Sequence, residues 1–430
     1  MLLQSRFILA FKQFCNEAMM KQATIFKNAL KKYLLFSGIV VHIAVFFILG
    51  FLLTEKISDH WRFKALMQFI QGPTDNTPIY QIPFDTYGKP NYSLIPKSQW
   101  LKIHQQSAED YISFPRQRHS GSAWDNKRHR LILFGSDTHG GNWDNSIYTF
   151  DLGYMAWQQE YTPSSFESYT VDKSGIPISK SKHGSMPWAM HTFDAINYLP
   201  HKDQLVVASY PNHLKPGKFG NWVASLWPKI TKHPTWIYSF NSKSWRAARG
   251  KPENFFPYSS AYNTKTGNIV GFRPNGIFEF NSYKSKWAKI GKKSINAYHT
   301  QAIYDSKNNA FLIFGEHKLS NDIHVFKPGS SESIKKSTTG KKPPKTQHAP
   351  FAYHEKKSEA VALVDTKSSD TGSETWTYNL EKNRWMHVET AKFPFKVGMN
   401  YHMQYSPYYN VLVLFANAPK EMASVWVLRL

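Results

Sequence analysis

Hydrophobic positions recur in one fixed unit along residues 98–430 of this chain. An aromatic residue, here called the marker aromatic, is followed seven positions later by an apolar residue that opens a short hydrophobic run. The spacing occurs six times, in the pairs Trp124/Leu131, Tyr198/Leu205, Tyr262/Ile269, Tyr304/Phe311, Tyr353/Ala360 and Tyr405/Leu412. Turn-forming and charged residues fill the gap, so each copy predicts a strand, a tight hairpin and a buried strand.

Further strands are predicted after each hydrophobic run. A third alternating strand follows, and in four copies a fourth strand carries tryptophan, at Trp157, Trp245, Trp287 and Trp385. The sixth copy stops at its third strand, while the segment Gln99–Ile103 precedes the first copy. We expect this segment, through Trp100, to supply the missing fourth strand and to close a ring of sheets. The pattern predicts an all-β, six-bladed β-propeller over residues 98–430.

The N-terminal part of the chain has a different pattern. Residues 33–53 form an uncharged run of 21 residues, from Tyr33 to Leu53, which as a helix spans about 30 Å and matches a bilayer core. Residues 1–32 carry six Lys or Arg and one acid, so they predict a cytoplasmic basic tail before an uncleaved transmembrane signal anchor. Residues 54–97 are rich in proline and without periodicity, and we expect them to form a stalk. The propeller is then periplasmic or extracellular.

Composition changes the picture through charge and cysteine. The chain carries 53 Lys and Arg against 30 Asp and Glu, a formal charge of +23, and its one cysteine is Cys15. No disulfide is available beyond the predicted anchor, which favours a bacterial periplasm or cell surface. A basic surface there attracts an acidic polysaccharide, lipopolysaccharide or an acidic protein. Nucleic acid is not an expected partner, because no signature of a nucleic-acid-binding fold occurs.

The first copy also carries a family resemblance. Residues 118–135, RHSGSAWDNKRHRLILFG, followed by NSIYTFDLGYMAW, are similar to a kelch repeat of the galactose-oxidase-like propeller superfamily. The resemblance covers about residues 98–430 and implies a kelch-type propeller, although Gly135 and Gly315 stand singly where the family has a Gly-Gly doublet. The copper-radical chemistry known in this superfamily needs a cysteine cross-linked to a tyrosine. No cysteine follows Cys15, so that activity is excluded, and we expect no cofactor.

Histidines recur near the predicted start of the innermost strands. His119, His299 and His348 lie five residues before a marker aromatic, His191 lies seven before and His402 three before. Odd offsets place these side chains on one face of the strand, and Arg116 and Arg118 flank the first of them. Three interpretations stay open: the lining of a wet channel, contact with an anionic ligand, or a metal site. We predict no metal, because no carboxylate or cysteine accompanies the histidines at a fixed spacing.

Two long insertions, about residues 161–187 and 210–235, are predicted on the same face as the histidines. Long loops on a rigid scaffold are common places for binding. We therefore expect a membrane-anchored, non-catalytic binding or scaffold module for a protein partner or an anionic glycan. The alternative is a carbohydrate-active enzyme, mutarotase-like or lyase-like, that uses a channel mouth lined by His and Arg. No catalytic residue is identified by a motif.

Overall fold

A computed structural model gives the fold of the C-terminal part of the chain. It divides the chain into two units, Met1–Gln71 and Gly72–Leu430, and the described residues belong to the second. The predicted tail, membrane helix and first part of the stalk lie outside the described residues. In the part that is described, no helix is long and apolar enough to cross a membrane. The described residues are 76–106, 119–136, 143–181, 184–218, 221–248, 259–295, 299–316, 319–365, 372–396, 402–416 and 423–430.

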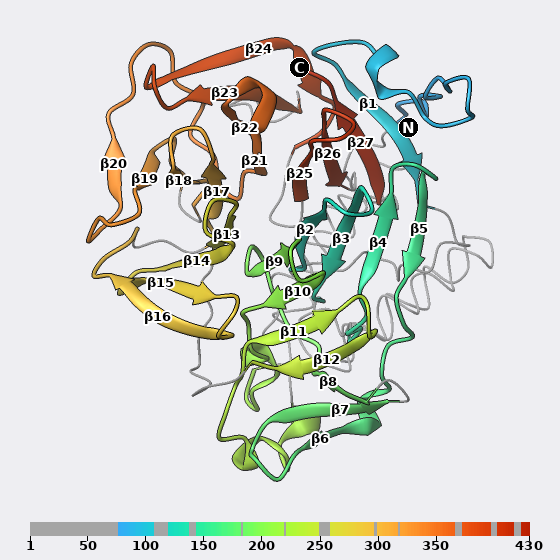
Figure 1. Ribbon diagram of the computed structural model, residues 1–430, viewed down its shortest axis with the longest axis vertical. Coiled ribbons are helices and arrows are strands. Elements are labelled where there is room, and N and C mark those ends of the chain that lie inside the picture. Colours follow the sequence, from blue (N-terminus) through green and yellow to red (C-terminus); the bar gives the residue numbers. More distant parts are fainter. Residues whose placement is uncertain are drawn as a thin grey trace, which may run out of the picture. The chain divides into compact units, whose positions relative to one another are not determined.

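The described residues form an all-β structure of six four-stranded antiparallel sheets and one three-stranded sheet (Figure 1). Sheet 1 contains β2 (Gly121–Asp125), β3 (Arg130–Phe134), β4 (Tyr148–Asp151) and β5 (Ala156–Gln159). Sheet 2 contains β9 (Ile196–Leu199), β10 (Gln204–Val207), β11 (Trp236–Ser239) and β12 (Ser244–Ala247). Sheet 3 contains β13 (Ser259–Asn263), β14 (Asn268–Arg273), β15 (Gly276–Asn281) and β16 (Lys286–Gly291).

The other three sheets repeat this meander. Sheet 4 contains β17 (Gln301–Asp305), β18 (Ala310–Phe314), β19 (Ile323–Phe326) and β20 (Ile334–Lys336). Sheet 5 contains β21 (Phe351–His354), β22 (Glu359–Asp365), β23 (Ser373–Asn379) and β24 (Arg384–Phe393). Sheet 6 contains β25 (His402–Ser406), β26 (Val411–Ala416), β27 (Ser424–Leu428) and β1 (Trp100–Gln105).

The seven-residue spacing read from the sequence is a hairpin register. Every marker aromatic is paired directly with the apolar residue seven positions later, from Trp124 opposite Leu131 to Tyr405 opposite Leu412. The fifth residue after each marker aromatic has a positive φ, at His129, Asp203, Gly267, Asn309, Ser358 and Asn410. A left-handed residue at this point lets a short turn return the chain in register. The six predicted hairpins are therefore confirmed.

The innermost strands of the six sheets close a propeller-like ring. Each of them contacts the next, in the cycle β2, β9, β13, β17, β21, β25 and back to β2. Figure 1 shows these strands around the centre and the fourth strands at the periphery. Apolar residues of neighbouring sheets pack together, so the core is divided among clusters that lie largely between adjacent sheets.

Closure uses the strand that precedes the first copy, as predicted. Strand β1 pairs antiparallel with β27, with Trp100 opposite Leu428. The Trp100 side chain is buried and lies against Phe393 of sheet 5, with ring centroids 5.8 Å apart. Its indole Nε1 donates to Thr375 Oγ1 at 2.9 Å. One strand thus completes sheet 6 and fastens it to sheet 5.

The segment predicted as a stalk is described from residue 76 onward, and there it packs on the sheets. Ile82, Tyr92 and Ile95 are buried in a cluster with residues of sheets 1 and 6. The Tyr92 hydroxyl donates to the Leu152 carbonyl at 2.9 Å. This stretch therefore shares a buried core with the two sheets and forms part of the domain.

An ion-pair network joins the hairpins of sheets 1 and 2. Arg128 donates through Nη1 to Asp125 Oδ2 at 2.9 Å and to Asp203 Oδ1 at 2.7 Å. The Tyr198 hydroxyl also donates to Asp203 Oδ1, at 2.8 Å. The Arg128 guanidinium beside Asp203 lowers the pKa of that carboxyl to about 2.

This network predicts an acid-dependent loss of stability. Because the folded-state pKa of Asp203 lies below its unfolded value, its charged form stabilises the fold above about pH 4, and this contribution disappears as the pH falls through about 2. We expect the stability gap between the wild-type protein and Asp203→Asn to be constant above pH 5 and to shrink toward pH 2. Thermal melts of both proteins across this range measure the gap, and a gap independent of pH would contradict the assignment.

Strand β1 gives a second prediction. Trp100→Ala removes the contact with Phe393 and the hydrogen bond to Thr375, so the free energy of unfolding should fall by about 3–5 kcal/mol. Denaturant unfolding of the full-length protein measures this loss. Tyr87→Ala is the control, because Tyr87 is 87% exposed and its removal should leave stability unchanged. Equal stabilities of the two variants would show that the Trp100 contacts of β1 do not stabilise the closed ring.

Candidate functional site

Aromatic side chains converge at the start of the innermost strands. The position five residues before the marker aromatic has a positive φ wherever it is described, at His119, Phe193, His299 and His348. Ring centroids are 5.3 Å apart for His119 and Phe193, 4.5 Å for Phe193 and His299, and 5.2 Å for His299 and His348. These four residues, from sheets 1, 2, 4 and 5, form what we call the mouth ring. A shared backbone turn therefore brings together side chains that are far apart in sequence.

Two further histidines extend the mouth ring on one side. His191 stacks on His119 with centroids 4.3 Å apart, and His213 stacks on His191 at 3.9 Å. His402 begins β25, and its Nε2 lies 3.1 Å from Ser120 Oγ, next to His119. The structure thus gathers the five histidines singled out from the sequence, and it adds His213. Arg116 and Arg118 lie outside the described residues.

Two glycines lie in close contact with the turns that carry the mouth ring. The His119 carbonyl accepts from the N–H groups of Thr192 and Phe193, at 2.9 and 3.2 Å. Gly135, directly after β3, has a φ of +109°, and a Cβ there would lie 2.4 Å from Thr192 Oγ1. Gly315, after β18, has a φ of +76°, and a Cβ there would lie 2.9 Å from a backbone nitrogen. The two glycines noted in the sequence therefore stand where any larger residue would displace the turns that carry the mouth ring.

The two predicted insertions pack into one unit, here called the insertion module. It contains the three-stranded sheet β6 (Tyr169–Val171), β7 (Pro177–Ser181) and β8 (Gly184–Pro187), and the short helices η3 (Phe166–Ser168), η4 (Asn212–Leu214), η5 (Asn221–Val223) and η6 (Trp227–Lys229). Its core is aromatic, with Trp222 5.1 Å from Trp143, 5.4 Å from Tyr169 and 5.4 Å from Phe166 between ring centroids. Figure 1 shows β6–β8 beyond β12, outside the ring of sheets.

The second insertion is basic, and it contacts the histidines of the mouth. Residues 210–235 contain no Asp or Glu, and their lysines, Lys215, Lys218, Lys229 and Lys232, are exposed. Helix η4 of this insertion carries His213 to its stack on His191. Phe166 is 46% exposed beside the partly buried Trp222, so apolar ring surface accompanies the positive charge. This combination suits a ligand with negative charges and apolar faces.

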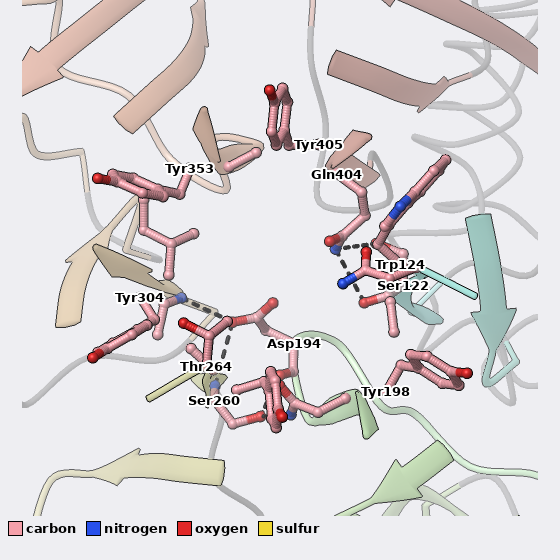
Figure 2. A pocket seen from close by; sticks show the side chains of 18 of the residues that line it. Ser122, Trp124, Asp194, Tyr198, Ser260, Thr264, Tyr304, Tyr353, Gln404 and Tyr405 are labelled. Atoms are coloured by element: carbon pink, nitrogen blue, oxygen red, sulfur yellow. Dashed lines mark hydrogen bonds between the residues drawn. The ribbon is translucent and has the colours of Figure 1, made fainter. Parts of the chain in front are cut away.

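A cavity of about 170 Å³ lies among the innermost strands and reaches their hairpins (Figure 2). Its wall is made by residues from two positions before to two positions after the marker aromatics, together with Asp194. In Figure 2 the rings of Tyr198, Tyr304 and Tyr353 point outward, away from the cavity. Small and polar side chains therefore make up most of the wall.

Asp194 is the main functional candidate that the sequence did not reveal. Its Oδ2 accepts from the Ala302 N–H at 2.8 Å and from the Ser260 N–H at 3.3 Å, which belong to sheets 4 and 3. Burial raises the pKa of Asp194 well above its usual value. The residue lies four positions before a marker aromatic, so the odd-offset rule that selected the histidines passed over it. His213 was missed because it lies within an insertion, outside the repeat.

No metal centre is assigned among the described residues. Within those ranges, no three or more His, Cys, Asp or Glu side chains form a group that could hold a metal ion. The ring nitrogens of His299 and His348, Nδ1 and Nε2, lie 3.3 Å apart. In a hydrogen bond between these two nitrogens, one nitrogen carries the proton and the other accepts it. The ring that accepts is therefore a neutral imidazole.

Asp194 gives the third prediction. Asp194→Ala leaves the N–H groups of Ser260 and Ala302 without their acceptor in a buried place, which costs about 1–3 kcal/mol of stability. Asp194→Asn keeps an oxygen that can accept from both, so its stability should stay close to that of the wild type. Denaturant unfolding of the three proteins compares them. Equal losses in both variants would mean that the two hydrogen bonds do not account for the contribution of Asp194 to stability.

No protein-family model matches the chain, and no curated protein matches its sequence. The kelch resemblance therefore rests on the residues of the repeats themselves, and the assignment to that superfamily stays a prediction.

Proposed function

We propose that this protein is a membrane-anchored, six-bladed kelch-type β-propeller that binds an acidic polysaccharide outside the cytoplasmic membrane and has no chemistry of its own. The closed cycle of six innermost strands and the hairpin register support the propeller. The kelch type is supported by the similarity of residues 118–135, and of the strand that follows them, to a kelch repeat. The anchor is supported by the uncharged run from Tyr33 to Leu53.

The observation that carries the proposal is the stack of histidines joined to a basic, aromatic insertion module. Imidazole groups donate hydrogen bonds to carboxylates and phosphates, and they gain charge when an anion binds beside them. His213, His191 and His119 form a continuous stack that links the module to the mouth ring. His191 in the middle of the stack is buried, so a ligand reaches the stack at its partly buried ends, His213 and His119.

The insertion module favours a polysaccharide over a small anion. A small anion needs one compact pocket, whereas the four exposed lysines of residues 210–235 are spread over the module. Sugar rings have an apolar face that packs on aromatic side chains, and Phe166 and Trp222 offer such a surface. A chain of acidic sugars can contact the lysines, the aromatic rings and the histidines at once.

A binding experiment with matched charge tests this proposal. The full-length protein is titrated with a panel of acidic polysaccharides at low and high salt. Lys229→Ala with Lys232→Ala removes two charges from the insertion module, and Lys265→Ala with Lys284→Ala removes two exposed charges from hairpins of sheet 3. We expect affinity to fall at least tenfold in the first double variant and less than threefold in the second, and to weaken in high salt.

Other outcomes would redirect the proposal. Equal losses in the two double variants would mean that net charge alone attracts the polysaccharide and that no site exists. If no polysaccharide of the panel binds, glycan binding is wrong and a protein partner is favoured. Release of a modified sugar during the incubations would support the enzymatic alternative at the same mouth.

A further inference from the structure

The cavity of Figure 2 extends along the innermost strands to their hairpins, whereas the mouth ring lies before the start of the strands. The mouth ring precedes the marker aromatics by five residues, whereas the hairpin residues two positions after them reach the cavity wall. These hairpin residues are Asn126, Pro200, Thr264, Glu355 and Pro407. Asn126, Thr264 and Glu355 are exposed, so the cavity reaches solvent between the first hairpins of the sheets. Its opening is therefore on the hairpin side, and its described lining includes none of the four mouth-ring residues.

The ionisable side chains that line this cavity are acidic, whereas the chain as a whole is basic. The chain carries a formal charge of +23, yet the described residues that line the cavity include no Lys, Arg or His. They include two acids, Glu355 at the opening and Asp194 at the base. Glu355 favours entry of a cation at the opening, and an ammonium group placed beside Asp194 favours the charged form of that carboxyl, so amine binding is coupled to loss of the Asp194 proton.

Asp194 is held in position for a ligand. Both of the hydrogen bonds that it accepts from Ser260 and Ala302 go to Oδ2. Within the described residues Oδ1 accepts no hydrogen bond, and Asp194 forms part of the cavity wall. A carboxylate fixed through one oxygen presents the other without further loss of side-chain freedom, which favours binding by preorganisation.

Two amide side chains add acceptors to the same wall. Asn197 donates through Nδ2 to Ser260 Oγ at 2.8 Å, and Gln404 donates through Nε2 to Ser122 Oγ at 3.0 Å. Because their nitrogens are used between neighbouring sheets, their carbonyl oxygens remain as acceptors at the wall. A primary ammonium has three N–H donors and no acceptor, and this set of oxygens matches it.

We propose that this cavity is a second binding site, which takes a primary ammonium group on a short aliphatic chain with Asp194 Oδ1 as its main acceptor. The volume of about 170 Å³ admits an aliphatic chain of about five carbons, since benzene fits a cavity of about 150 Å³. Two sources have this chemistry, a free small amine and the lysine side chain of a partner protein. The site does not depend on the proposed polysaccharide function.

Calorimetric titration of the full-length protein with n-pentylamine tests the site. 1-Pentanol is the matched neutral ligand, because it has the same chain and lacks the positive charge. We expect the wild-type protein to bind the amine at least tenfold more tightly than the alcohol. Asp194→Asn should lose at least tenfold in amine affinity, because an amide cannot become the carboxylate that pairs with the ammonium, while it keeps an acceptor for Ser260 and Ala302. Its melting temperature is measured beside the wild type, to separate lost binding from lost folding.

The two sources and the possible failures give distinct results. A Gly-Lys-Gly peptide that binds more tightly than n-pentylamine, and loses binding when its lysine is acetylated, identifies a partner's lysine, whereas weaker peptide binding identifies a free amine. No binding of n-pentylamine or the peptide, equal binding of amine and alcohol, or unchanged amine affinity in Asp194→Asn would each overturn the proposal. If Asp194→Asn does not fold, Glu355→Gln at the exposed opening serves instead, with an expected loss of about threefold and no loss if the proposal is wrong.

Discussion

The structure depends on hydrogen bonds to the backbone groups at the free edges of the six innermost strands. Each innermost strand pairs on one side only, so its other edge presents unpaired backbone groups toward the channel. Polar side chains from other sheets meet this need. Asp194 accepts from Ser260 and Ala302, and Gln301 accepts from the Phe351 N–H at 2.6 Å. The residues that line the channel therefore hold the ring together, and any function they acquire is built on that role.

The two ends of the channel differ because the two ends of the innermost strands differ. At the start of the strands, left-handed turns place His119, His299 and His348 around the mouth ring. At their other end, hairpins turn the marker aromatics outward and leave small and polar residues with Asp194 and Glu355 around a cavity. One repeated backbone unit thus produces a mouth lined by histidine and phenylalanine and a cavity whose ionisable residues are Asp194 and Glu355. The two proposed sites follow from this polarity of the strands.

The repeat pattern predicted local structure well, because a hairpin is decided by residues close together in sequence. The seven-residue spacing corresponds to a direct cross-strand pair in every copy, and residues 99–103 coincide with most of β1. The odd offsets of the histidines also pointed to one end of the innermost strands. The sequence did not reveal that Phe193 occupies the equivalent position in sheet 2, because a phenylalanine there carries no polar signal.

What the sequence by itself determined is the six repeated hairpins, their register and the strand that closes the ring. Those features depend on hydrophobic period and turn chemistry, which act over fewer than ten residues. Strands β6, β7 and β8 lie in an insertion that the sequence predicted as a loop. Only the tertiary structure decided that Asp194 reaches two other sheets and that His213 joins the histidine stack from an insertion. Contacts between sheets depend on the geometry of the whole ring, and no local spacing encodes which side chains meet across it.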